Sequence, residues 1–316
     1  MMRKLTHYFF GQQDQHLYSF FRTAIAIFCF IHFSSIFLDF ELLYAKDGLI
    51  PPEVSGLFKL SWIPNFNNLA IFLSKSVGCT YESATLIFKY VYLLSCLLLA
   101  AGFLTRFWAL MLLFLHLVLA KGTPFYAYGV DYFTTIALFY CTVFPVGSQH
   151  SVDNLIFNRT TGNAFAFKRV LQVHLCIVYL FSGFDKLTGY NWRNGEAVWK
   201  AIHLPYFNQD FQFNANIFAS YPWVMVIIGW GTICIELLYP VMISLKKTRP
   251  IWLSLTIMMH IGILLYLNLY FFSTLMILLN LSAYADLSVA KKPSNSRSWF
   301  NSFSRLPLPL FKKNIE

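Results

Sequence analysis

The sequence contains little charge. Asp, Glu, Lys and Arg make up 12% of its 316 residues, whereas 57% are hydrophobic, and the mean hydropathy is +0.56. A soluble protein usually contains about 25% charged residues, so this composition excludes a separate soluble domain. Because long apolar stretches recur along the whole chain, the sequence predicts an all-α integral membrane protein.

The sequence also lacks the residue spacings of common metal and redox sites. No two histidines stand at ligand spacing on one predicted helix, and the six cysteines include no closely spaced pair. We therefore predict no metal site. The net charge of +10 does not indicate nucleic-acid binding, because the basic residues are spread over loops and a tail, where topology and anionic membrane lipid explain them.

Eight stretches approach the length of about 20 apolar residues that a transmembrane helix needs. The first is interpreted as a retained helix rather than a cleaved signal, since Arg22 interrupts it. The third and seventh are short, so we expect a bundle of about eight spans, at residues 17–38, 84–104, 107–121, 127–146, 168–188, 222–245, 251–267 and 269–286.

Basic residues set the expected orientation. With the N-terminus inside, most of the 24 Lys and Arg residues fall in inner segments, as the positive-inside rule requires. Both termini are therefore predicted to be cytoplasmic. We expect a transmembrane domain over residues 1–288 and a basic cytoplasmic tail over residues 289–316, in which prolines stand among Ser and Lys.

Two outer segments, 39–83 and 189–221, are too long to be simple turns and are rich in aromatic residues and Leu. Loops of this length are usually functional or disordered. We expect them to form interfacial helices, mainly over 57–73 and 197–218, that together cover a cavity opening outward.

Ionisable residues inside a membrane span are functional candidates by default. At about 1.5 Å per helical residue, Asp131 and Tyr132 lie roughly one turn below the outer surface. Asp185 and Lys186 reach the same depth in the fifth span, and Lys89 near the outer end of the second span belongs to this layer. The sequence therefore predicts a shared site in the outer leaflet.

The fifth span places its polar groups on one face. Gln172, Leu175, Tyr179, Ser182 and Lys186 follow one another at intervals of three and four residues. This face carries an amide, a phenol, a hydroxyl and an amine among otherwise apolar residues. A largely buried amine at the end of such a face is a candidate general base.

Each of these residues also has a structural interpretation. Lys186 can extend to the outer headgroups, as terminal lysines often do, and its position alone does not decide between this and a site. Asp131 can simply neutralise Lys186 or Lys89. Arg22 is expected to extend to the inner membrane surface.

A second polar pair consists of Glu236 and His260. Both lie at similar depth in the inner half of the sixth and seventh spans. An interhelical hydrogen bond, worth about 0.6 kcal/mol, is the structural alternative to a functional role for this pair, and the sequence leaves both interpretations open.

Several motifs resemble one family of membrane proteins. The run Val178–Leu187, which contains Ser-Gly-Phe-Asp-Lys, and the segment Asn191–Trp199 resemble the signature of the vitamin K-dependent gamma-carboxylase-like family. This family is also called the horizontally transferred transmembrane (HTTM) domain. Stretches 43–51, 128–132 and 260–276 are similar to the same family, so the resemblance covers most of the chain.

The resemblance implies an activity. In that family's carboxylases, the lysine matched by Lys186 is the base that deprotonates a reduced quinone. Oxygenation of the quinone then yields a strong base, which allows carbon dioxide to add to a glutamate. We therefore expect a bacterial inner (cytoplasmic) membrane enzyme that uses reduced menaquinone or a related quinone, with Lys186 and Asp131 as catalytic residues. The expected pocket residues are Tyr132, Tyr179, Ser182, Asp185, Trp192 and Lys89.

Two departures argue against glutamate carboxylation itself. The carboxylases carry a large extracytoplasmic domain that grips the substrate protein, whereas this chain ends in the basic tail, and Val130 stands beside Asp131 where the carboxylases have a His. A second hypothesis is a non-catalytic accessory membrane protein for the maturation or secretion of a peptide or protein partner. Whether the chain is an enzyme, its substrate and its oligomeric state stay open.

Overall fold

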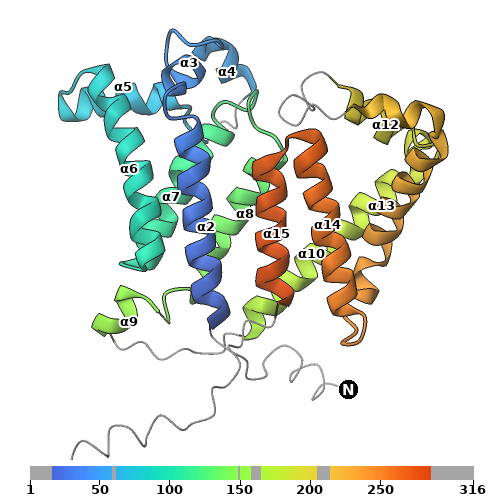
Figure 1. Cartoon of the computed structure of the whole chain (residues 1–316). Coiled ribbons are helices and arrows are strands. Elements are labelled where there is room, and N and C mark those ends of the chain that lie inside the picture. Colours follow the sequence, from blue (N-terminus) through green and yellow to red (C-terminus); the bar gives the residue numbers. More distant parts are fainter. Residues whose placement is uncertain (1–15, 59–61, 149, 158–164, 205–213, 286–316) are drawn as a thin grey trace, which may run out of the picture. The chain divides into compact units, whose positions relative to one another are not determined.

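The computed structural model describes residues 16–58, 62–148, 150–157, 165–204 and 214–285, and in these residues it contains helices and no strands. The expected all-α class is confirmed. All eight stretches expected as spans are helical (Figure 1), and the helices are α2 (His16–Ser35), α6 (Tyr81–Ala101), α7 (Thr105–Ala120), α8 (Gly129–Val143), α10 (Phe165–Thr188), α13 (Pro222–Met242), α14 (Arg249–Leu267) and α15 (Tyr270–Tyr284).

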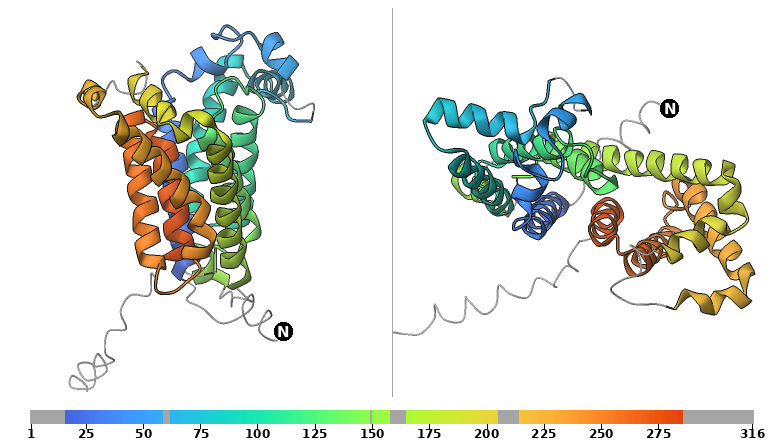
Figure 2. Two further views of the ribbon diagram at one scale, coloured as in Figure 1. Left: turned by 90° about the vertical axis from the view of Figure 1, so that its right-hand side faces the viewer. Right: turned by 90° about the horizontal axis from the view of Figure 1, so that it is seen from above.

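Four of these helices are long and apolar enough to cross a membrane, namely α6, α10 over Phe167–Thr188, α13 and α14. Helices α7, α8 and α15 are apolar but shorter. Gly102 and Asn268, both with left-handed backbone conformations, reverse the chain between α6 and α7 and between α14 and α15. A left-handed residue after a helix is a common way to end it. The chain therefore folds as a membrane bundle of antiparallel neighbouring helices (Figure 2).

Short helices lie at the two ends of the bundle (Figure 1). One end, here called the α12 end, carries the segments expected to be interfacial: α3 (Phe40–Tyr44), α4 (Pro52–Phe58), α5 (Phe66–Val77), α11 (Tyr190–Arg193), α12 (Glu196–His203) and the 3-10 helix η1 (Ala215–Ser220). The opposite end carries α9 (Val152–Phe157).

The expected interfacial helices are interrupted. Instead of a helix over 57–73, α4 ends at Phe58 and α5 starts at Phe66, after Asn65 accepts a hydrogen bond from the backbone of Asn68 as its N-cap. Likewise, the stretch 197–218 contains α12 and η1, with residues 205–213 outside the described residues. The proposed domain boundary at 288 and the tail 289–316 also lie outside the described residues.

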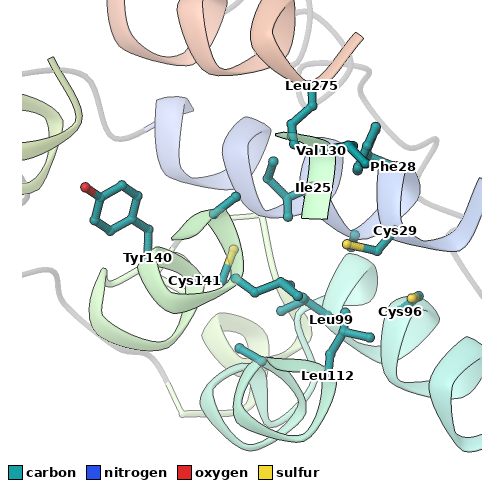
Figure 3. Close-up of a cluster of buried hydrophobic side chains, with 14 of the residues drawn as sticks. Ile25, Phe28, Cys29, Cys96, Leu99, Leu112, Val130, Tyr140, Cys141 and Leu275 are labelled. Atoms are coloured by element: carbon teal, nitrogen blue, oxygen red, sulfur yellow. The ribbon is translucent and has the colours of Figure 1, made fainter. Parts of the chain in front are cut away.

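The apolar core lies between α2, α6, α7, α8 and α15 (Figure 3). Its members include Ile25, Leu99, Leu112, Val130 and Leu275, all nearly or fully buried. Cysteines of α2, α6 and α8 are buried in the same cluster, in agreement with their interpretation as small apolar residues. The same cluster continues to Leu175 and Tyr179 of α10 and to Tyr239 of α13, so the core adjoins the candidate site.

Helices α10 and α13 approach closely where glycines allow it. A Cβ atom at Gly183 of α10 would lie 2.8 Å from the backbone nitrogen of Leu237 and 3.0 Å from Cβ of Glu236. At Gly229 of α13, a Cβ would collide with the backbone carbonyl of Trp192. Small residues at helix interfaces permit this close contact. As a result, α10 and α11 are fixed against the face of α13 that carries Glu236.

Arg22 does not extend to the membrane surface as expected. Its side chain is 1% exposed and donates hydrogen bonds to the backbone carbonyls of Val146, His150 and Ala100, at 3.0, 2.8 and 3.3 Å. Ala100 lies in the last turn of α6, where carbonyls lack helical partners. A guanidinium with several donors suits such a cluster of carbonyls. Arg22 therefore has a structural role.

Candidate functional site

Lys186 and Glu236 form an ion pair between α10 and α13. The Lys186 Nζ atom lies 2.8 Å from Oε2 and 3.1 Å from Oε1 of Glu236, and it donates to Ser182 Oγ at 2.6 Å. Side chains of a helix lean toward its N-terminus, so Lys186 turns back over Ser182, one turn earlier. The exposed fractions of the two side chains are 17% for Lys186 and 7% for Glu236. The ion pair is therefore largely withdrawn from the surface.

The position of Glu236 along α13 places this ion pair well inside the bundle. Glu236 comes fourteen residues after Pro222, which corresponds to about 21 Å along the helix. Helix α13 extends past the end of α10, because Trp192 of α11 packs against Gly229, about two turns into α13. The Lys186 amine is directed at Glu236 of the neighbouring helix, which favours the site interpretation over that of a surface-reaching lysine.

A chain of hydrogen bonds joins four helices beside the ion pair. Tyr239 donates to Asn280 Oδ1 at 2.6 Å, and Asn280 Nδ2 donates to the Tyr179 hydroxyl at 2.8 Å. The Tyr179 oxygen lies 2.8 Å from His260 Nε2. Since Asn280 already supplies a proton to the Tyr179 oxygen, Tyr179 satisfies its own proton by donating to His260 Nε2.

This direction fixes the tautomer of His260. With Nε2 as acceptor, the ring proton of a neutral His260 is on Nδ1, and Nδ1 has no hydrogen-bond partner within the described part of the chain. His260 is 3% exposed. An unsatisfied buried donor costs about 1–3 kcal/mol, so it requires an explanation. Because His260 lines a cavity, a molecule bound there could accept this hydrogen bond.

A cavity of about 730 Å³ lies between α10, α13 and α14, and residues of α12, the helix labelled at the upper right of Figure 1, also line it. Lys186, Glu236, Ser182, Tyr179 and His260 stand on its wall, and most of the remaining lining is apolar. Ligand pockets typically have volumes of roughly 300–1,000 Å³ with an apolar lining and few polar groups. The cavity therefore suits a mainly apolar molecule that carries a small polar part.

Asp131 does not belong to this cavity. Its Oδ2 accepts a hydrogen bond from the backbone of Tyr128 at 3.0 Å, which caps the start of α8. Its backbone carbonyl lies 3.1 Å from His116 Nε2. The expected pairing of Lys186 with Asp131 is therefore incorrect, because Asp131 is engaged at the N-terminus of its own helix, where a carboxylate satisfies orphan N–H groups.

Three other expected pocket residues also lie elsewhere. Lys89 pairs with Glu41 of α3 at 3.1 Å and faces the ring of Phe37 at 4.1 Å. The ring of Tyr132 lies under the Lys121 amine at 3.9 Å. Asp185 is exposed on α10 and does not line the cavity. Of the expected residues, the cavity thus brings together Lys186, Tyr179, Ser182, Trp192, Glu236 and His260.

Asn280 and Tyr239 were not predicted as site residues, and Lys186 and Glu236 were predicted to lie in separate layers. Asn280 was the detectable signal, because an amide in the middle of an apolar span needs a partner. Tyr239 follows Glu236 by three residues and therefore lies on the same face of α13. These spacings reveal the faces of single helices but not which faces meet.

Fold and cavity together define a polytopic helical membrane protein with an ion pair on the wall of an apolar cavity. None of the protein-family models, curated proteins or solved structures compared with this chain matches it. The function is therefore inferred from the cavity and the residues that line it.

Proposed function

We propose that the chain is a bacterial inner-membrane enzyme related to the gamma-carboxylase-like (HTTM) family, and that the Lys186–Glu236 pair accepts a proton from a reduced lipid quinone. The observation that carries this proposal is the ion pair on the wall of an apolar cavity between helices. Charged groups inside a helical membrane protein are rare and usually functional. A cavity lined mainly by apolar residues, with Lys186 and Glu236 as its charged residues, is complementary to a hydroquinone, which has an apolar ring and acidic hydroxyl groups.

Proton transfer in this site involves both partners of the ion pair. A protonated amine cannot act as a base, so Lys186 first passes a proton to the Glu236 carboxylate, 2.8 Å away. The neutral amine then takes the proton of a substrate hydroxyl, which leaves an aryloxide next to the lysinium. After this step Lys186 carries a positive charge beside the anion, and Glu236 is a neutral acid. Ser182 holds the amine in place during the exchange.

His260 supplies a second polar contact to the same substrate. Its Nδ1–H group has no partner within the described residues, and its ring lines the cavity. A quinone-type molecule has two oxygens on opposite sides of its ring, so one oxygen at Lys186 leaves the other available as an acceptor. The bond from Tyr179 keeps His260 in the donating tautomer.

The membrane assignment and orientation belong to the same proposal. The excess of basic residues in the inner segments puts both termini in the cytoplasm, so the α12 end faces outward. The reaction that the family resemblance implies next consumes oxygen, with the deprotonated quinone as reductant.

Turnover of reduced menaquinone by the purified chain in lipid, with and without oxygen, tests the proposal. We expect an oxygen-dependent product from the native chain, none from Lys186→Met, and normal activity from Lys89→Met. Lys89 is the control for loss of a buried lysine paired with a glutamate away from the cavity, and activity is compared per folded protein because Lys186→Met is expected to be the less stable variant. Product from Lys186→Met would refute Lys186 as the base. No turnover by the native chain would favour an accessory role, and a co-purifying peptide or protein partner would then be sought.

A further inference from the structure

Two glycines on the cavity wall have open space where a side chain would begin. Gly231 of α13 and Gly262 of α14 both line the cavity, and a Cβ atom at either position meets no other atom within 4 Å. Glycines at membrane helix interfaces usually allow helices to approach closely, which would place neighbours there. These two glycines therefore widen the cavity instead of joining helices.

Other glycines of the same bundle show the contrast. Gly183 and Gly229 have backbone atoms where a Cβ would be placed, and a Cβ at Gly129 would lie 3.1 Å from the ring of Phe272. Replacing any of these three would push packed helices apart. A Cβ atom at Gly231 or Gly262 would contact no other residue and would only fill part of the cavity. The space that these glycines leave is therefore available to a ligand.

The cavity beside the two glycines reaches the exposed side surface of helices α13 and α14. Ile228 of α13 and Met258 and Tyr266 of α14 line the cavity, yet their exposed fractions are 43%, 66% and 39%. The two buried residues within α14 are Thr256 and His260. In a membrane protein, such an exposed apolar helix contacts lipid chains.

We propose that the apolar chain of the bound ligand leaves the cavity toward the lipid between α13 and α14, through the room left by Gly231 and Gly262. This inference rests on the proposed function, because the ring of the same ligand is placed at Lys186 and Glu236. Gly231 precedes Glu236 by five residues, which is about 7.5 Å along the helix. A chain attached to a ring at Glu236 therefore reaches Gly231 within its first few carbon atoms.

The experiment compares two ligands and three variants. The ligands are naphthoquinones that share one ring, of which one carries a prenyl chain and the other only a methyl group. Their affinities are measured on the full chain in one detergent, for the native protein, Gly231→Leu, Gly262→Leu and Gly56→Leu. Gly56 lies in α4, a Cβ there also meets no atom within 4 Å, and it does not line the cavity. It is therefore the matched control for adding a leucine.

We expect the native chain and Gly56→Leu to bind the prenylated ligand more tightly than the methylated one. In Gly231→Leu and Gly262→Leu this preference falls by about tenfold, since several methylene groups lose their contacts, while binding of the methylated ligand is unchanged. An unaltered preference in both cavity variants would overturn the inference and leave the proposed function intact. Equal loss of both ligands would overturn it as well, because the glycines would then shape the ring site. Absence of binding to the native chain would instead refute the proposed function and the inference with it.

Discussion

Replacement of the Lys186–Glu236 pair by apolar residues tests how the ion pair is held. Removing one partner of a buried pair leaves an uncompensated charge and costs about 3–5 kcal/mol, whereas replacing both is often neutral or stabilising. Lys186→Met leaves the Glu236 carboxylate, 7% exposed, without its cation. Glu236→Leu leaves a lysine that is 17% exposed and lies 5.2 Å from the Trp192 ring. We therefore expect Lys186→Met to be the more destabilising single change, by about 4 kcal/mol.

A double-mutant cycle separates the contributions to this cost. We expect the double variant Lys186→Met, Glu236→Leu to unfold within about 1 kcal/mol of the native chain, so that the coupling free energy is several kcal/mol. The free energy of unfolding is measured by reversible denaturation in detergent. Lys89→Met is the control: its partner Glu41 is 51% exposed, so water solvates the remaining carboxylate, and the cost is about 1 kcal/mol. Costs of Lys186→Met and Glu236→Leu that simply add in the double variant would refute this reasoning.

Three further predictions test the architecture around the site. Arg22→Ala removes a guanidinium that donates hydrogen bonds to three backbone carbonyls. We therefore expect the free energy of unfolding to fall by about 3 kcal/mol or more. Arg106 is exposed and serves as the control, so an equal loss for Arg106→Ala would contradict this expectation. Gly183→Ala places a methyl group against the backbone of α13 and should lower the free energy of unfolding by about 1–3 kcal/mol. Gly231→Ala meets no neighbouring atom and should raise it by up to about 1 kcal/mol. Similar melting temperatures for the two variants would show that Gly183 is not tightly packed. Asp153→Ala removes a buried carboxylate that accepts two backbone N–H groups at the start of α7, and should cost about 2 kcal/mol, detectable as faster hydrogen exchange of those amides.

Hydropathy was sufficient to predict the bundle. Each expected span is a helix, with ends that differ from the expected ends by a few residues, because apolar length and flanking Gly and Pro decide where a membrane helix can begin and end. The short connections make neighbouring helices antiparallel without further information. The interfacial segments were harder to predict, because aromatic richness indicates contact with a surface but does not reveal the caps that break a segment into two helices, such as Asn65.

The pairing of the charges was not predictable from the sequence. Depths counted from helix ends placed Lys186 near the surface and Glu236 in the opposite half of the bundle. This count fails because α13 extends beyond α10, and because Lys186 turns back toward the start of its helix. Asp131 offered a better signal that was overlooked: an acidic residue at the third position of a helix typically caps it.

The three basic residues of the predicted spans illustrate how a structural charge differs from a functional candidate. Arg22 donates to the backbone carbonyls of Val146 and His150, in the loop after α8, and does not line the cavity. Lys89 has an anionic partner that water reaches. Lys186 alone of the three lines the cavity, and its carboxylate partner lines it too. A buried ion pair is weak evidence for a role in stability, so the position of this pair on the cavity wall fits the proton transfer that we propose.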